Sequence, residues 1–250
     1  MLTTELHNGI TVLRLNHGKV NAFDLELMRR WIDEITVLER SETPAVVLTG
    51  TGSVFSAGVD LRQLIAGGRE YVQEFVPLLG DMLFKTFTFP KPLVAAVNGH
   101  AVAGGCLLAC ACDYRVMSEG EGRIGVPELS VGVPFPSVAM EILRLTLPNH
   151  RLQSLIYGGL TCTPNEALTN GFVDELTESG NLLSRALAMA TRLGSLPPAS
   201  FRLTKRMIRQ PSRDRMVHYM RGIDTEVLEA WQSSSVLRAV DEYVQRTLKK

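Results

Sequence analysis

The sequence lacks a long hydrophobic run and an excess of charge of either sign, and each absence excludes a class of protein. No apolar run approaches the roughly 18 to 20 residues that a helix needs to cross a bilayer, so we expect no membrane partner. Basic and acidic side chains both number 26, which gives a formal net charge of zero. Without a basic stripe or an aromatic RNA-binding motif, we also expect no nucleic-acid partner.

Cysteine is scarce, and its spacing argues against both a disulfide framework and a metal centre. The chain has four cysteines, and Cys106, Cys110 and Cys112 crowd into one apolar segment while Cys162 stands apart. The first three are too close for an ordinary set of disulfides and lack the CxxC spacing and partner histidines of a zinc site. We therefore expect four buried structural thiols and no metal ion.

Targeting signals are missing as well. The amino terminus reaches an amphipathic strand pattern almost at once, with no apolar signal-peptide core before it. The last three residues, Leu248, Lys249 and Lys250, match neither a peroxisomal tripeptide nor a prenylation box. The sequence predicts a soluble, unprocessed, cytoplasmic protein.

The composition that is present is that of a globular domain. Apolar residues make up 45% and charged residues 21% of the chain, close to the averages for soluble domains, which argues against disorder and fibrous folds. A chain of 250 residues forms either one large α/β domain or two small ones, and length alone does not choose between them. The fold class must therefore come from the residue pattern.

The amino-terminal half alternates strands and helices. Residues 3–15 alternate apolar and polar side chains around Asn8-Gly9, a strong hairpin signal, and residues 24–38 have helical spacing with Asp24 as a cap. Three β-branched runs follow, at residues 45–49, 92–97 and 114–117. Helical stretches lie between them, at residues 60–66, 69–87 and 104–112. This rhythm indicates a βα-repeating domain with a largely buried sheet.

The carboxyl-terminal part is helical. After Gly132, helical patterns occupy residues 137–147, 150–157, 164–170, 180–195, 198–209 and 214–246. No internal repeat or long linker separates these helices from the rest, so we expect them to pack on or near the sheet. We divide the chain into an α/β core, residues 1–195, and a helical subdomain, residues 196–250, which covers the pocket or a neighbouring subunit.

Three segments carry the candidate chemistry, at residues 55–60, 98–106 and 124–129. In the first two, Ala57-Gly58 and Gly104-Gly105 are small enough for the main chain to approach a ligand. Both segments run into helices, whose first N–H groups have no intrahelical acceptor, and two such donors aimed at one oxygen form an oxyanion hole. Taken singly, each is better explained as a tight strand-to-helix turn, but the ordered set is more specific.

Together these segments resemble the enoyl-CoA hydratase/isomerase family, also called the crotonase superfamily. The resemblance runs from about residue 20 to about residue 173 and is strongest between Phe55 and Gly132. It implies an α/β fold, a crotonase-like spiral of ββα repeats with a carboxyl-terminal helical subdomain. It further implies an acyl-CoA substrate, no cofactor apart from the coenzyme A of that substrate, and a homotrimer or hexamer.

The resemblance also assigns the oxyanion hole. In that family, the motif similar to Ala57-Gly58-Val59-Asp60 supplies one N–H group, and the glycine that matches Gly104 supplies the other. The match therefore implies that the amides of Ala57 and Gly104 hold the thioester oxygen. It also implies that the other residues of both motifs contact the substrate. Because a thioester enolate places negative charge on that oxygen, each donor contributes about 3 kcal/mol to transition-state stabilisation.

Two carboxylate positions discriminate between the reactions of the family. In family hydratases, one glutamate lies a helical turn after the oxyanion glycine and a second lies further on, in a Gly-x-Pro-Glu segment. Here Leu107 occupies the first position and Glu128 the second, within Gly125-Val126-Pro127-Glu128. This pattern resembles the 3,2-trans-enoyl-CoA isomerase branch, whose motif also reads Gly-Gly-Cys-Leu and keeps the later glutamate.

A single glutamate suits a double-bond shift better than a hydration. Adding water requires a base for the water and an acid for the α-carbon, and Leu107 supplies neither. Moving a double bond from the 3 to the 2 position requires one carboxylate, which takes a proton from C2 and returns it at C4. An apolar wall of Leu107, Val133, Pro134 and Phe135 would raise the pKa of Glu128 for this task. We therefore predict Δ3-Δ2 enoyl-CoA isomerisation.

Two alternatives remain open. An enoyl-CoA hydratase, or another lyase or hydrolase of the superfamily, would use the same oxyanion hole with differently placed acids and bases. A non-catalytic acyl-CoA-binding protein would keep the pocket without turnover, and Glu128→Gln separates this reading from an isomerase.

Four other polar residues are weaker candidates. His100 lies in a turn beside the oxyanion segment and could act as a base, and Glu141 lies on an expected helix that could reach the pocket. Asp60 is better explained as a helix cap, and Asp113 as a structural carboxylate.

Overall fold

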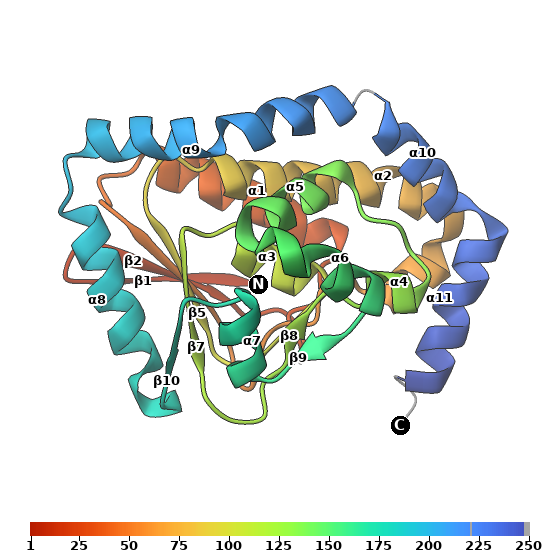
Figure 1. Cartoon of the computed structure of the whole chain (residues 1–250), viewed down its shortest axis with the longest axis horizontal. Helices are drawn as coiled ribbons and strands as arrows, with labels where there is room; N and C mark the ends of the chain where they lie inside the picture. Colours follow the sequence, from red (N-terminus) through yellow and green to blue (C-terminus); the bar gives the residue numbers. More distant parts are fainter. Residues whose placement is uncertain (221, 248–250) are drawn as a thin grey trace.

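The strands of the protein form two sheets. The computed structural model describes residues 1–220 and 222–247. Within these residues, the larger sheet has the strand order β1-β2-β3-β5-β7-β10, with β1 antiparallel to β2 and all other neighbours parallel (Figure 1). Its strands are β1 Leu2–His7, β2 Ile10–Leu15, β3 Val46–Gly50, β5 Leu93–Val97, β7 Tyr114–Ser118 and β10 Glu175–Thr177. The smaller sheet consists of β4 Val54–Ser56, β6 His100–Val102, β8 Ile124–Gly125 and β9 Thr161–Cys162.

The two sheets are built by a repeating ββα unit. The helices of the core are α1 Leu25–Arg40, α2 Leu61–Thr88, α3 Gly104–Cys110 and α4 Glu128–Val131. In the successive units β3-β4-α2, β5-β6-α3 and β7-β8-α4, the first strand joins the larger sheet and the second joins the smaller one. Successive units pair in parallel, so the chain advances as a spiral, which confirms the predicted fold class.

Local sequence signals in the amino-terminal region correctly predicted its turn and its first helix. Asn8 and Gly9 both have positive φ angles, of 50° and 85°, as a two-residue hairpin turn of type I′ requires. The Asp24 side chain accepts a hydrogen bond from the Leu27 amide at 2.7 Å and thereby caps α1. The expected helices at residues 60–66 and 69–87 are one element, α2, with a kink at Gly68, whose φ of 57° is open to glycine.

The carboxyl-terminal helices partly depart from prediction. Helices α5 to α8 confirm it, at Ser137–Thr146, Asn149–Gly158, Pro164–Asn170 and Leu182–Gly194, with a short 3₁₀ turn at Ser179–Asn181. The expected boundaries at 198–209 and 214–246 are wrong, because α9 Pro198–Tyr219 continues through Pro211, and α10 Ile223–Gln232 and α11 Ser234–Thr247 follow. Ser233 separates the last two helices: it is extended, and its hydroxyl accepts from the Val236 amide at 3.2 Å.

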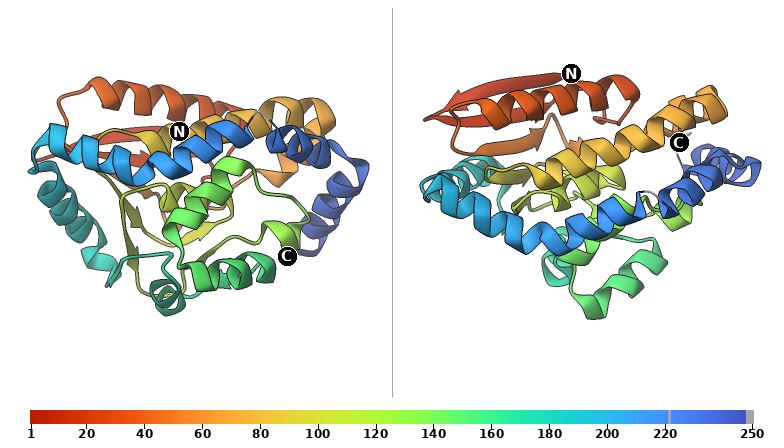
Figure 2. Two further views of the ribbon diagram at one scale, coloured as in Figure 1. Left: turned by 45° about the horizontal axis from the view of Figure 1, so that its top comes forward. Right: turned by 90° about the horizontal axis from the view of Figure 1, so that it is seen from above.

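Helix α9 is tied to the core by a buried charge cluster. Figure 2 shows α9 running across one face, between α8 at one end of the molecule and α10 and α11 at the other. Lys205 and Arg209 of α9 bind the two oxygens of Asp113, at 2.7 and 2.8 Å, which gives Asp113 the structural role expected for it. Burial lowers the pKa of Lys205 to about 8, and Asp113 opposes this change. The division into residues 1–195 and 196–250 stays a prediction.

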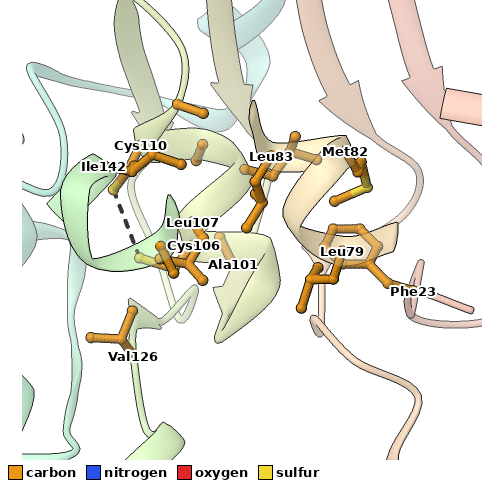
Figure 3. Packing of buried hydrophobic residues seen from close by; sticks show 14 of the residues in the cluster. Phe23, Leu79, Met82, Leu83, Ala101, Cys106, Leu107, Cys110, Val126 and Ile142 are labelled. Atoms are coloured by element: carbon orange, nitrogen blue, oxygen red, sulfur yellow. Dashed lines mark hydrogen bonds between the residues drawn. The ribbon is translucent and has the colours of Figure 1, made fainter. Parts of the chain in front are cut away.

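The cysteines are buried and reduced, as predicted. All four are free thiols. The sulfur atoms of Cys106 and Cys110 lie 3.9 Å apart on one side of α3 (Figure 3), well beyond the roughly 2.05 Å of a disulfide bond. Within residues 1–220 and 222–247, no group of three histidine, cysteine, aspartate or glutamate side chains is placed to hold a metal ion. In the same ranges, no helix has the length and apolar character to span a membrane.

Candidate active site

The candidate site is a cavity of about 710 Å³ between the second strands of the repeats and the helices that cover them. It receives side chains or main chain from α2, α3, α4, the segment after α4, and the two last helices. Its lining includes Ala57, Val59, Asp60, Leu79, His100, Gly104, Leu107, Glu128, Val133, Pro134, Phe135, Trp231 and Tyr243. Every predicted site residue except Gly58 therefore lines one cavity, and Gly58 stands between two lining residues, Ala57 and Val59.

Gly58 allows the first two motifs to meet. Its φ is +78°, and a Cβ atom at this position would lie 2.7 Å from both the Gly104 nitrogen and the Val102 carbonyl oxygen. A Cβ atom on Gly104 would in turn lie 3.0 Å from the Phe23 ring. Gly58 is required because its φ is positive and the main chains approach one another there, whereas a side chain on Gly104 would press against the Phe23 ring.

The Ala57 amide is not available to a ligand, which corrects the sequence prediction. Its N–H group donates to the carbonyl oxygen of Val20 at 2.9 Å. Val59, two residues after Ala57, pairs with Phe23 as an isolated parallel β-bridge. The main-chain N–H of Phe23 donates to the carbonyl oxygen of Gly58 at 2.6 Å, and the carbonyl oxygen of Phe23 accepts from the amide of Asp60 at 2.9 Å. These two bonds lie on either side of Val59.

This pairing leaves the Val59 amide open. In a parallel bridge, one residue makes both hydrogen bonds, and its partner's own N–H and C=O groups point to the opposite side. Phe23 makes both bonds here, so the Val59 N–H points away from it. Among the described residues, the amides of Val59 and Gly104 donate no hydrogen bond, and both residues line the cavity.

Ala103 sets the direction of the Gly104 amide. It has φ 52° and ψ −124°, a strained conformation for a residue with a side chain, and it caps the amino end of α3. Its N–H donates to the carbonyl oxygen of Gly125 at 2.9 Å, and its carbonyl oxygen accepts from the amide of Leu107 at 3.0 Å. These two hydrogen bonds hold the strained residue in place. The chain therefore turns sharply from β6 into α3, and Gly104 becomes the first residue of the helix beside the cavity.

Glu128 is a buried carboxyl group with one unpartnered oxygen. It is 7% exposed and begins α4, and its Oε2 atom is buried with no hydrogen-bond partner among the described residues. Burial raises the pKa of Glu128 to about 8. The amides of Gly132 and Val133 donate to its main-chain oxygen, at 2.9 and 3.0 Å, which holds α4 and the following segment in place. The buried side chain therefore has a raised affinity for protons.

The position of the second carboxylate of a hydratase is apolar. Leu107 is 2% exposed and belongs to the hydrophobic cluster that Figure 3 draws, with Ala101 and Leu79. Within the described part of the chain, the only other carboxylate that lines the cavity is Asp60. Asp60 caps α2, where its Oδ1 accepts from Arg62 and Gln63 at 3.0 and 3.1 Å, as the sequence predicted. Glu128 is left as the one buried carboxylate at the centre.

Two weaker candidates have other roles. His100 is the first residue of β6 rather than a turn residue, and its Nδ1 atom accepts from the Arg123 amide at 3.2 Å while the residue lines the cavity. Glu141 does not line the cavity. It is fully buried, and although burial raises its pKa, hydrogen bonds from Arg215 and Arg144 bring the pKa below its usual value. Glu141 is therefore a structural carboxylate.

Sequence reasoning missed the residues that arrive from distant segments. Lys19 and Arg62 bring positive charge to the lining, and Trp231 and Tyr243 bring aromatic rings from α10 and α11. Lys19 stands at the start of the region of resemblance and was a usable signal. Nothing near Trp231 or Tyr243 in the sequence indicates a pocket.

A spiral of ββα repeats that brings two open amides and a buried glutamate to one apolar cavity is the arrangement of a crotonase-type enzyme. The chain belongs to the enoyl-CoA hydratase/isomerase family, whose model matches residues 5–248.

The relatives include enzymes of both kinds. Mitochondrial enoyl-CoA delta isomerase 1 of Mus musculus is 28% identical over 254 residues, which cover 100% of this chain and 88% of the relative. The short-chain-enoyl-CoA hydratase of Clostridium acetobutylicum is 30% identical over 208 residues, covering 82% and 79%. The crystal structure of human mitochondrial delta3-delta2-enoyl-CoA isomerase superposes with a TM-score of 0.94, at 25% identity, over 99% of this chain and 98% of that one. The family is thus established, and the reaction must be argued from the site.

Proposed function

We propose that this enzyme moves the double bond of a 3-enoyl-CoA to the 2 position, with Glu128 as its only base. The observation that carries the proposal is the pair of residues at the two carboxylate positions. Glu128 is buried with its Oε2 atom unpartnered among the described residues, and Leu107 occupies the place of the second carboxylate. An isomerase needs one group that both accepts and returns a proton, whereas a hydratase needs two groups.

The first step is proton removal from C2. The thioester oxygen accepts hydrogen bonds from the amides of Val59 and Gly104, and the Glu128 carboxylate takes the C2 proton. The electron pair of the C2–H bond moves to the oxygen and forms a dienolate, whose charge the two amides stabilise. Ala57, Gly58 and the remaining motif residues position these donors rather than donate themselves.

The second step returns the proton at C4. The enolate oxygen re-forms the thioester carbonyl, the double bond settles between C2 and C3, and C4 takes the proton from the Glu128 carboxyl. The carboxylate is regenerated, so no further reactant is consumed. The pKa of about 8 supports this cycle, because a group that must accept and then give back a proton is most effective when its pKa is near the working pH.

The substrate itself supplies coenzyme A, and we propose that no further cofactor is needed. Lys19 and Arg62 supply cations in the lining for its phosphates, while Leu107 and Phe135 contact the acyl part. Turnover after exhaustive dialysis against a chelator tests the cofactor proposal. The family resemblance supports a homotrimer or hexamer, which light scattering of the purified protein measures. Cytoplasmic location stays a prediction, since the mouse relative is named mitochondrial, and fractionation of cells tests it.

The experiment supplies a 3-enoyl-CoA and, separately, a 2-enoyl-CoA, and follows the absorbance of the conjugated thioester. We expect absorbance to appear from the first substrate and to persist with the second. Glu128→Gln should remove the reaction and leave acyl-CoA binding intact. Glu141→Gln is the matched control, a buried glutamate away from the cavity, and its folded fraction should keep turnover.

Other outcomes replace the proposal. If the 2-enoyl-CoA is consumed, the enzyme is a hydratase, the alternative that the Clostridium acetobutylicum relative supports. If neither substrate changes while coenzyme A thioesters still bind, the enzyme catalyses another reaction of the superfamily, or the chain only binds them.

A further inference from the structure

Helices α10 and α11 close one side of the cavity of their own chain. Figure 1 shows them descending along one edge of the molecule beside α4, the helix that begins with Glu128. A Cβ atom on Gly132, the residue that ends α4, would lie 2.8 Å from the Cβ of Ala239 on α11. Trp231 of α10 and Tyr243 of α11 reach the lining from this side.

The Trp231 ring is held in one position. The residue is 2% exposed, and its indole N–H donates to the carbonyl oxygen of Pro134 at 2.9 Å. The next residue, Gln232, joins α10 to α2: its carbonyl accepts from Arg69 Nε at 2.8 Å, and its side-chain amide donates to Gln73 at 2.6 Å. Trp231 is therefore fixed both to the segment that follows Glu128 and, through its helix, to α2.

The wall around Trp231 is apolar, and the charged groups of the lining come from other segments. Leu79, Val133 and Phe135 line the cavity together with Trp231 and belong to the same core cluster. The cations of the lining, Lys19 and Arg62, come from the loop before α1 and the start of α2. The phosphates of coenzyme A suit the cationic part of the lining. The acyl tail is a hydrocarbon, so its burial is most favourable against the apolar wall on the Trp231 side.

We propose that Trp231 is the end wall of the acyl-binding part of the cavity and sets the longest acyl chain that the enzyme accepts. This inference rests on the proposed function, since it places C2 to C4 of the substrate beside Glu128. The carbons beyond C4 then run toward the segment 133–135 and meet the indole ring. A large, immobile ring at this point limits chain length, whereas a smaller side chain extends the cavity.

Activity measurements with a substrate series test the proposal. The substrates are the 3-hexenoyl, 3-octenoyl, 3-decenoyl and 3-dodecenoyl thioesters of coenzyme A, and the variants are Trp231→Ala and Trp231→Phe. We expect Trp231→Ala to raise kcat/KM for the longest substrates relative to the shortest by at least about tenfold, the lower end of the usual effect of one methylene in an apolar pocket. Trp231→Phe should give a smaller change in the same direction.

Trp31 provides the matched control, because the chain has two tryptophans and both are buried with a satisfied indole N–H. Trp31 is 1% exposed, donates to Thr86 Oγ1 at 2.8 Å, and does not line the cavity. Trp31→Ala should reduce stability as Trp231→Ala does but leave the order of substrate preference unchanged. If both alanine variants shift the preference equally, the effect is general loosening and the proposal is wrong.

A binding measurement separates this inference from the reaction itself. In Trp31→Phe, Trp231 is the sole tryptophan, and its fluorescence is followed while saturated acyl-CoAs from butanoyl to dodecanoyl are added. These ligands carry no double bond, so the result does not depend on isomerisation. We expect an emission change that grows with chain length and is absent with free coenzyme A.

Each other outcome has a defined meaning. If the emission of Trp231 responds to chain length but no isomerase activity is found, the inference stands and the proposed reaction fails. If acyl-CoAs bind with no change that depends on chain length, the inference fails and the proposed function is untouched. If no acyl-CoA binds, both are overturned.

Discussion

A Cβ atom on Gly58 would lie 2.7 Å from the amide nitrogen of Gly104, so these two glycines bring the candidate oxyanion donors together. We expect Gly58→Ala to lower kcat by about a hundredfold or more, the usual effect of losing one oxyanion donor, because the new methyl group must push the Gly104 amide away. Steady-state kinetics with a 3-enoyl-CoA measures this loss.

Gly9 is a suitable control for that substitution. Its φ of +85° matches the +78° of Gly58, but nothing lies within 4 Å of a Cβ atom there. Gly9→Ala therefore imposes a similar backbone strain without the close contact, and turnover by the folded enzyme should stay at the wild-type level. Equal losses in both variants would show that backbone strain, rather than displacement of the donor, is responsible.

The pH dependence of the reaction should report Glu128. A base must be ionised, and burial raises the pKa of this carboxyl to about 8. We therefore expect kcat/KM to rise with pH and level off above about pH 8, since this parameter follows ionisation of the free enzyme. A profile that is already level at pH 6 would mean that Glu128 ionises near its ordinary value or is not the base.

Stability should depend on pH through the same residue, with a sign opposite to that of an ordinary ion-paired carboxylate. The folded pKa of about 8 lies above the usual 4.5, so the folded state binds more protons between these values. The stability present below about pH 4.5 is therefore lost progressively as pH rises to 8. One pH unit corresponds to about 1.4 kcal/mol, so the total loss is at most about 5 kcal/mol.

Glu128→Gln removes this titration and should be more stable than wild type above pH 8, with little difference near pH 4. Urea unfolding at both pH values measures the change. Glu141→Gln should instead lose stability at neutral pH, because two arginines hold the pKa of Glu141 below its usual value. If Glu128→Gln is destabilised at alkaline pH, the carboxylate has a favourable partner that opposes its burial.

The buried cluster at Asp113 makes a prediction about stability alone. Asp113→Ala leaves Lys205 and Arg209 buried without their shared carboxylate, and we expect a loss of about 3 to 5 kcal/mol in the free energy of unfolding. Chemical denaturation measures it. The turnover of the folded fraction should be retained, since none of the cavity-lining groups is changed. The second substitution Lys205→Met should recover part of the loss, and failure to do so would show that the ion pairs are not its source.

Features that depend on neighbouring residues could be predicted from the sequence. Asn8-Gly9 specifies its own hairpin turn, and Asp24 caps the helix that it precedes. The environment of Glu128 was also accessible in part, because Val133 and Phe135 follow it closely and line the same cavity. In each case, the interacting groups are separated by a few residues only, so local spacing determines the contact.

Features that depend on distant pairing could not be predicted. Whether Ala57 or Val59 offers its amide is decided by the contacts of this segment with Val20 and Phe23, and a strand of two or three residues such as β8 leaves no periodicity to detect. The tryptophan at position 231 reaches the cavity only because α10 folds back on α2. The break at Ser233 had a local signal in its run of serines, which the helical spacing of the apolar residues outweighed.

The position of α10 and α11 has a consequence for how the enzyme is made. These helices are the last described elements of the chain, yet they complete a cavity whose other walls come from α2, α3 and α4. During synthesis on the ribosome, Leu79 and Phe135 therefore emerge long before Trp231, which lines the same cavity. The nascent chain exposes an apolar surface throughout that interval, which makes it prone to aggregate until α10 and α11 have folded.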